Sequence, residues 1–184
     1  MKNAFLADPA RMRALRATGL LDRDPAPALD RLVRLASNIF EAPVSLVSLV
    51  DADRQFFAAQ VGLETPWSNA RETPLSHSFC KHVVESGEPL VIDDARADAR
   101  IARNPAVDDL NVRAYAGMPL YGEEDGHTLG SFCVIDDHPR QWTPRELRIL
   151  RDLADAAMTE IRLRRATNDV AEALDQMRRE LEAR

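Results

Sequence analysis

Residues 44–62, VSLVSLVDADRQFFAAQVG, decide the fold class of this chain. The run 44–50 follows Pro43, is short and apolar, and is rich in β-branched valine, which is typical of a mostly buried strand. The polar turn DADR comes next, and a second apolar run, QFFAAQV, ends at Gly62. Two strands joined by so short a turn predict an antiparallel hairpin.

Three further strands are expected downstream of this hairpin. They are EPLVID at 88–93, RAYAGMPLY at 113–121 and TLGSFCVID at 128–136. The polar turn GEEDGH joins the last two, so the sheet is expected to be mainly antiparallel. Residues 94–112 form a long connection with one or two short helices, around Ile101 and over 107–110, and connections of this length often carry function.

Helical patterns precede and follow the strands. Asp8 and Pro9 start a short helix that Gly19 ends, because an acceptor side chain at the cap and a fixed φ at the first position favour a helix start. A second, amphipathic helix carries apolar residues at helical spacing, namely Leu29, Leu32, Val33, Ala36, Ile39 and Phe40. Thr143, Pro144 and Glu146 form a capping-box start for the last helix, and neither Gly nor Pro interrupts the chain from there to Arg184.

The last helix changes character along its length. Its first half has an apolar stripe suited to packing on the domain, at Leu147, Leu150, Ala154, Ala157 and Ile161. Its second half alternates spacings of four and three, which is a heptad seam, at Leu163, Thr167, Val170, Leu174, Met177 and Leu181. We expect a parallel homodimer through this seam; the alternative is that the helix folds back onto its own domain.

These elements predict an α+β domain, a central sheet with flanking helices and a long C-terminal helix. The expected parts are an N-terminal helix and linker at 1–24, the globular domain at 25–162 and a coiled-coil-like helix at 163–184. Hydrophobic residues make up 45% and charged residues 29% of the 184, which is the composition of soluble globular proteins.

Composition also excludes several classes of partner. The net charge of -6 argues against a nucleic-acid binder, which needs a basic face. The chain has neither the roughly 20-residue apolar run of a membrane span nor an N-terminal signal peptide. We therefore expect a cytoplasmic protein that binds neither nucleic acid nor membrane.

Within the segment ETPLSHSFCKHVVESG, residues 72–87, seven consecutive residues hold two histidines, two hydroxyls and a thiol: Ser76, His77, Ser78, Cys80 and His82. A catalytic thiol needs a nearby base, but His82 lies about 200° around a helix from Cys80. Zinc needs three or four converging ligands, more than this helix offers. Cys80 belongs instead to an apolar stripe with Phe79, Val83 and Val84, so we interpret 72–87 as a helix that opens near Thr73 to Ser76 and buries Cys80. We expect neither a metal site nor an enzyme.

The second cysteine, Cys133, lies on the expected strand 128–136. Alternation places Ser131, Cys133 and Ile135 on one face of that strand, together with Leu129. If this face meets the helix that carries Cys80, the two thiols could approach each other and respond to oxidants. Ordinary core packing of both cysteines is the competing interpretation.

The ordered set of segments resembles the GAF family of bacterial sensor domains, which is related in fold to PAS domains. The matching pieces span about residues 13–160: ALRATGLLD, LDRLVRLASNIFEAPVSLVSLVDADRQFF, ETPLSHSFCKHVV, LVIDDARAD, AYAGMPL and GSFCVID. The resemblance implies that a small molecule or another cue biases the domain and that the long helix carries this bias to an output domain. Outputs in such proteins include histidine kinase, diguanylate cyclase and phosphatase modules, and no such motif follows Arg145. The output is then a further domain or a separate effector protein.

The resemblance also implies a pocket in front of the sheet. The candidates for lining it are His77, Phe79, Cys80, Asp94, Arg96, Leu110, Tyr115 and Met118. Covalent bilin is excluded because the attachment region, NPAVDDLNV, has no cysteine, and the cysteines of a free methionine sulfoxide reductase are missing from DARADARIARNP. No cofactor is predicted. A ligand-free interaction or dimerisation module, with its pocket filled by its own side chains, is the alternative function.

Overall fold

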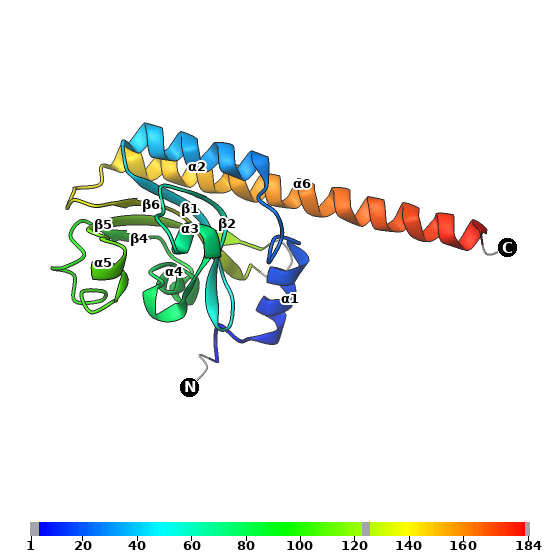
Figure 1. Ribbon diagram of the computed structural model, residues 1–184, viewed down its shortest axis with the longest axis horizontal. Coiled ribbons are helices and arrows are strands. Elements are labelled where there is room, and N and C mark those ends of the chain that lie inside the picture. The colour runs from blue at the N-terminus through cyan, green and yellow to red at the C-terminus, as the bar shows by residue number, and fades with distance from the viewer. Residues whose placement is uncertain (1–3, 123–125, 183–184) are drawn as a thin grey trace.

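The computed structural model describes residues 4–122 and 126–182, and Figure 1 shows their arrangement. The helices are α1 (Pro9–Ala17), α2 (Pro27–Phe40), α3 (Trp67–Ala70), α4 (Cys80–Ser86), α5 (Ala106–Asp109) and α6 (Pro144–Glu182), with a 3₁₀ turn η1 (Leu75–His77). The strands are β1 (Val44–Val50), β2 (Arg54–Val61), β3 (Glu72–Pro74), β4 (Leu90–Ile92), β5 (Ala114–Tyr121) and β6 (Thr128–Asp136). The α+β class expected from the sequence is confirmed.

All six strands form one sheet in the order β3-β2-β1-β6-β5-β4, and every neighbouring pair is antiparallel. β1 and β6 form the centre, with Ser48 opposite Ser131 and Leu46 opposite Cys133. The predicted hairpin 44–62 is β1 and β2. Its last residue, Gly62, has φ +83°, and a Cβ there would lie 1.8 Å from the Pro43 carbonyl oxygen, so only glycine fits.

Helices cover both faces of the sheet (Figure 1). The long helices α2 and α6 lie side by side on one face, which we call the back face. On the other, the front face, lie α4 and α5 with their loops. Each face has its own apolar core, because strand side chains alternate between the two sides of a sheet.

Helix α1 adds Met12 and Leu15 to the back core. Its start is as predicted: Asp8 accepts a hydrogen bond from the Arg11 backbone N–H at 2.8 Å. The Arg11 side chain is buried, and its guanidinium donates to the carbonyls of Leu6 and, at 2.9 Å, Val50. The N-terminal segment is thereby joined to the end of β1, a role that the sequence pattern does not reveal.

Helix α6 begins with the predicted capping box. The Thr143 hydroxyl accepts from the Glu146 N–H at 3.2 Å, and the Glu146 carboxylate accepts from the Thr143 N–H at 2.7 Å. Ile161 is the last buried residue of the helix, and every residue from Ala166 to Glu182 is exposed. The distal half of α6 therefore projects from the domain, as Figure 1 shows. The expected continuation to Arg184 lies partly outside the described residues.

Two local expectations are wrong, and a third holds only in part. The helix predicted to open near Thr73 to Ser76 starts only at Cys80, because residues 72–74 pair with β2 as the edge strand β3 and 75–77 form η1. Ile39 is 45% exposed, since α2 faces the sheet with Leu29, Val33, Ala36 and Phe40. Around Ile101 the chain forms turns, and of the two short helices only α5 is present within 94–112.

Within 4–122 and 126–182, none of the helices combines the length and the apolar character that a bilayer-spanning segment requires.

Candidate functional site

A small apolar pocket lies on the front face, between the sheet and the cover made by η1, α4 and α5. Its lining residues are Val44, Leu46, Gln55, Phe57, Leu63, His77, Phe79, Cys80, Ala106, Leu110, Val112, Tyr115 and Ile135. The cavity volume is only about 30 Å³. Pockets that hold small-molecule ligands typically measure about 300–1,000 Å³, so this pocket is nearly filled by its own side chains.

Two aromatic rings fill much of this space. Phe79 and Tyr115 have ring centroids 5.4 Å apart and an interplanar angle of 56°, a favourable tilted arrangement. Both side chains are almost fully buried. The Tyr115 ring lies across Gly117, where a Cβ would come within 2.2 Å of the Tyr115 hydroxyl. Gly117 is therefore required for this ring position.

Thiols and hydroxyls gather at the inner end of the pocket. The Cys80 Sγ lies 3.3 Å from Tyr115 Oη and 3.9 Å from Cys133 Sγ. Tyr115 Oη is also 3.3 Å from Ser131 Oγ. Ser48, opposite Ser131 in the sheet, is fully buried on the same face. We call these five residues, Ser48, Cys80, Tyr115, Ser131 and Cys133, the polar cluster.

The polar cluster shifts the pKa values of its two thiols in opposite directions. Burial raises the pKa of Cys80, but hydrogen bonds from Cys133, Tyr115, Ser48 and Ser131 to its thiolate outweigh burial and lower the pKa below the ordinary value. Burial and the hydrogen bond with Cys80 raise the pKa of Cys133 well above its ordinary value. Burial also raises the pKa of Tyr115, and the neighbouring Cys80 adds to that rise. Of the two thiols, Cys80 is the one that ionises first.

The rim of the pocket is held by polar contacts. His77 Nε2 lies 2.9 Å from the Asp109 carboxylate of α5, and its ring packs 5.5 Å from that of Trp67. The Ser78 hydroxyl donates to Gln55 on β2 and accepts from the Lys81 N–H at 3.0 Å, so it anchors the start of α4 to the sheet. These contacts fix the position of the front cover over the sheet.

Five of the eight pocket candidates line the cavity, namely His77, Phe79, Cys80, Leu110 and Tyr115. Met118 does not: it belongs to the back core, because it is three residues from Tyr115 on β5 and alternation puts it on the opposite face. Asp94 and Arg96 also lie outside the lining. Asp94 accepts from the Arg96 N–H at 3.0 Å in an exposed turn, and the Arg96 guanidinium lies 3.8 Å from Asp108.

Several lining residues were not expected from the sequence. Gln55 and Phe57 come from β2, and Leu63 and Ala106 from loops or short helices. Phe57 and Gln55 share one face of β2 with a spacing of two, and this alternation was the available signal. The other two residues carry no local pattern, because only the packing of distant segments brings them to the pocket.

The remaining site candidates lie elsewhere. Cys133 belongs to the polar cluster. The six seam residues of α6 lie on its distal half, and five of them are large side chains that are exposed by 60% to 74%: Leu163, Val170, Leu174, Met177 and Leu181. Thr167, the sixth, is also exposed and donates its hydroxyl to the Leu163 carbonyl at 2.8 Å.

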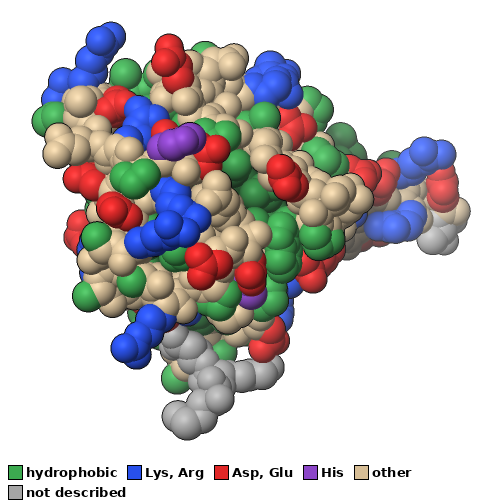
Figure 2. Space-filling model, turned by 60° about the vertical axis from the view of Figure 1, so that its left-hand side comes forward, with side chains coloured by type: hydrophobic (Ala, Val, Ile, Leu, Met, Phe, Trp, Pro, Cys, Tyr) green, Lys and Arg blue, Asp and Glu red, His purple; other side chains and the backbone are tan. Residues whose placement is uncertain are grey.

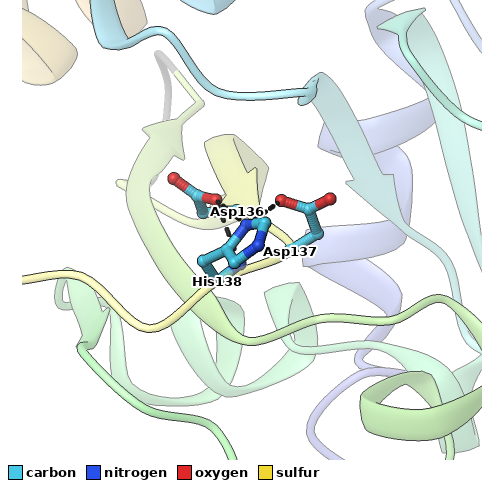
Figure 3. Close-up of side chains that lie close together, drawn as sticks. All are labelled: Asp136, Asp137 and His138. Carbon is cyan, nitrogen blue, oxygen red and sulfur yellow. Dashed lines mark hydrogen bonds and ion pairs between the residues drawn. The ribbon is translucent and has the colours of Figure 1, made fainter.

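A group of ionisable side chains follows β6 and is drawn in Figure 3. His138 Nδ1 lies 2.7 Å from Asp137 and 3.9 Å from Asp136. Asp136 also pairs with Arg140 at 2.9 Å. An exposed ion-pair group accounts for this arrangement, and acidic and basic side chains are similarly interspersed over the face seen in Figure 2.

Comparison with known proteins places this geometry in a family. The model of the GAF domain family matches residues 24–161. Over 156 residues the chain is 35% identical to a cyclic di-GMP phosphodiesterase of Pseudomonas aeruginosa; the match covers 84% of this chain but 26% of that protein. The chain thus spans about a quarter of the length of this relative.

Solved structures share the fold at lower identity. The GAF domain of a phosphoenolpyruvate-protein phosphotransferase from Coxiella burnetii aligns with a TM-score of 0.64 and 20% identity, over 86% of this chain and 96% of that one. The free methionine-R-sulfoxide reductase of Neisseria meningitidis aligns with a TM-score of 0.63 and 19% identity, over 85% and 91%. Both likenesses concern the fold.

Proposed function

Because the chain belongs to the GAF domain family, we propose that it is a sensory domain that passes its state through a dimeric helix α6 to an output domain or effector protein. Family membership supports a signalling role. The dimer, the ligand and the output are the parts of the proposal that experiments have to test.

The observation that carries the proposal is the exposed apolar seam of α6. Five large apolar side chains lie along one stripe of a helix that has left its own domain. Each would release roughly 1.5–3 kcal/mol on full burial, so leaving all five in water is unfavourable. Their spacings of four and three suit a parallel two-helix coiled coil, in which each seam residue packs against the same seam of a second copy.

The seam also defines a direction for signalling. The first half of α6 packs on the back face of β5 and β6, whereas its distal half is available to a second copy. A change in the sheet can therefore shift the rotation or register of the two α6 helices where they meet. An output placed after the helix would receive that shift.

The pocket supports two versions of the input. In the first, a small apolar molecule enters the front pocket and displaces Phe79 or Tyr115, since a cavity of about 30 Å³ has no room for it otherwise. In the second, the chain is a ligand-free interaction and dimerisation module. The filled pocket favours this second version. The first version is favoured by the front cover, because its short helices and loops can be displaced more easily than α2 and α6.

We infer that the domain acts in cyclic di-GMP signalling. The support is the relative with 35% identity, which is named as a cyclic di-GMP phosphodiesterase and is about four times as long as the matched part. In this role the present chain supplies regulation, and the turnover of the dinucleotide belongs to other parts of the full protein or to a partner.

We also infer that the chain has no catalytic activity of its own. The hydrogen-bond contacts of the Cys80 thiol within the described residues are Tyr115 and Cys133, and neither is a general base of the kind that nucleophilic catalysis requires. His77 is engaged by Asp109, and His82 is half-buried beside Glu85. Covalent bilin is not part of the proposal, because both cysteines belong to the polar cluster.

The dimer is tested by sedimentation equilibrium on the full chain and on a chain ending at Ile161. We expect the full chain to be a dimer and the shortened chain a monomer. Leu174→Lys should weaken dimerisation by at least about tenfold, because it puts a charge into the seam. Glu172→Gln changes the net charge by the same amount outside the seam and is the matched control. A monomeric full chain would remove the proposed route of signalling.

The ligand is tested by native mass spectrometry of the protein purified from its own host. A small molecule in the pocket appears as added mass that is lost on denaturation. Protein with no added mass, together with a dimeric full chain, would select the ligand-free version.

A further inference from the structure

The two cysteines of the chain meet in the front core although 53 positions separate them in sequence. Cys80 comes from the start of α4 and Cys133 from the middle of β6, and their Sγ atoms are 3.9 Å apart. A disulfide has an S–S distance of about 2.05 Å, so the two sulfurs would need to approach by roughly 1.9 Å. Closing this gap requires rotation of the two side chains and a shift of the short helix α4.

The surroundings of the pair are unusual for buried cysteines. Free cysteine in a core normally behaves as a small apolar residue among other apolar residues. Here the Tyr115 hydroxyl lies 3.3 Å from Cys80, and the Ser131 hydroxyl lies next to that of Tyr115. The Ser48 hydroxyl is fully buried and has no hydrogen-bond partner among the described residues in this state. A buried hydroxyl without a partner is costly, and a thiolate at Cys80 would give it one.

The two thiols differ in access. Cys80 lines the cavity of about 30 Å³, whereas Cys133 lies behind it and is not part of the lining. Both are buried, so bulky reagents cannot reach either sulfur in the folded protein. A cavity of this size admits a neutral molecule about as large as water. Hydrogen peroxide belongs to this class.

We propose that Cys80 and Cys133 form a redox-sensitive dithiol, which hydrogen peroxide converts to an intramolecular disulfide. The Cys80 thiol loses its proton, and the thiolate attacks one peroxide oxygen; an S–O bond forms, the O–O bond breaks, and the leaving hydroxide takes the proton that Cys80 released to become water. Cys133 then loses its proton and attacks the sulfenic sulfur of Cys80; the S–S bond forms and the S–O bond breaks. The hydroxide released takes that proton, giving a second water. In total, two thiols and one peroxide yield a disulfide and two waters.

The disulfide would join the front cover to the central strand of the sheet. β6 continues through residues 137–143 into α6. The disulfide would therefore attach the front cover to the strand that leads into the helix proposed to carry the signal. The dithiol chemistry does not depend on the dimer, and each is tested separately.

The experiment exposes the folded full chain to hydrogen peroxide, stops the reaction with acid and measures intact mass and free thiols after unfolding. We expect the mass to fall by two hydrogens, both thiols to be lost, and a reducing agent to restore them. Protease digestion should then give one cross-linked peptide pair that contains Cys80 and Cys133 of the same chain. Retention of both thiols at peroxide concentrations that oxidise the urea-unfolded chain would overturn the proposal, as would a disulfide formed between chains.

Two variants separate the roles of the sulfurs. In Cys133→Ala the reaction should stop at the sulfenic acid of Cys80, which a 1,3-diketone reagent traps. In Cys80→Ala the rate of oxidation of the remaining thiol should fall by at least about tenfold, because Cys133 is less accessible and less acidic. Equal rates in the two variants would contradict the order of attack. Thermal unfolding of each variant checks that it is folded, and the wild-type measurement stands even if one variant is not.

Discussion

The two faces of the sheet are built differently. The back face is covered by two long helices, α2 and α6, and its core consists of apolar side chains such as Val33, Phe132 and Leu150. The front face is covered by short helices and loops, and its core includes two thiols and three hydroxyls. We expect the back face to be the more rigid framework, and the front face is where we propose that a ligand or an oxidant acts. Three substitution experiments test this difference.

The largest expected effect comes from shortening one buried leucine to alanine on each face of the sheet and comparing the two losses of stability. Leu150→Ala on α6 removes a fully buried side chain from the back core and should lower the free energy of unfolding by about 3–5 kcal/mol. Leu46→Ala on β1 removes a side chain of equal size beside the front cavity. It should cost less, about 2 kcal/mol, because the front cover can move in to fill the space.

Urea denaturation of the two variants measures both costs. Leu35→Ala on the exposed side of α2, outside the seam, is the control for helix propensity and should leave the stability nearly unchanged. A cost at Leu46 equal to or above that at Leu150 would show that the front cover is as rigid as the back layer.

Removing the Tyr115 hydroxyl should have a smaller effect on the free energy of unfolding. Tyr115→Phe keeps the ring but removes the hydroxyl from the polar cluster, and should cost about 0.5–1.5 kcal/mol. It should also raise the pKa of Cys80, since a hydrogen bond from this hydroxyl helps to lower that pKa. The rate at which hydrogen peroxide oxidises Cys80 in the folded protein, measured against pH, reports the change.

The reverse substitution on the back face is the matched control. Phe132→Tyr introduces a hydroxyl into an apolar core that offers it no obvious partner, so it should cost more than the loss of the Tyr115 hydroxyl. If the Cys80 pKa stayed the same in Tyr115→Phe, the polar cluster would not be what controls the thiol.

The smallest expected effect is the pH dependence of stability at two helix starts, that of α6 on the back face and that of α4 on the front face. Glu146 is partly buried, which favours its neutral form, but hydrogen bonds from Thr143 and the charge of Arg140 lower its pKa below the ordinary 4.5. Because the folded-state pKa is the lower one, this contribution to stability is present above pH 4.5 and is lost as the pH falls through the folded-state value.

The contrasting helix start on the front face uses a neutral group, the Ser78 hydroxyl at α4. The melting temperatures of wild type and Glu146→Gln should become more similar as the pH falls below 4.5. The difference in melting temperature between wild type and Ser78→Ala should stay constant over the same pH range. A constant difference for Glu146→Gln would contradict the role of its charge in the α6 cap.

Much of the fold was accessible from local pattern. β1 and β6 have the predicted limits, and the capping box at Thr143 marks the start of α6 correctly. These segments were predictable because their signals lie within a few residues of one another. β3 was missed because a three-residue edge strand exists only through its pairing with β2.

The candidate site was predictable in part for the same reason. The helical stripe at Phe79 and Cys80 indicates burial correctly, and both residues line the cavity. Met118 was assigned to the wrong face although alternation from Tyr115 was available. Leu63 and Ala106 had no signal, since a loop and the short helix α5 bring them to the pocket from distant parts of the chain.

By itself, the sequence determined the α+β class, the order of the main strands and the seam on a long helix, because hydrophobic period and capping chemistry are local properties. It also allowed the two thiols to meet without requiring it. Only the tertiary structure decided that the front pocket is nearly filled, that Tyr115 lies across Gly117, and that Cys80 and Cys133 are 3.9 Å apart among buried hydroxyls. Contacts between segments so far apart in the chain depend on how side chains of particular volumes pack between two layers, and no local pattern contains that information.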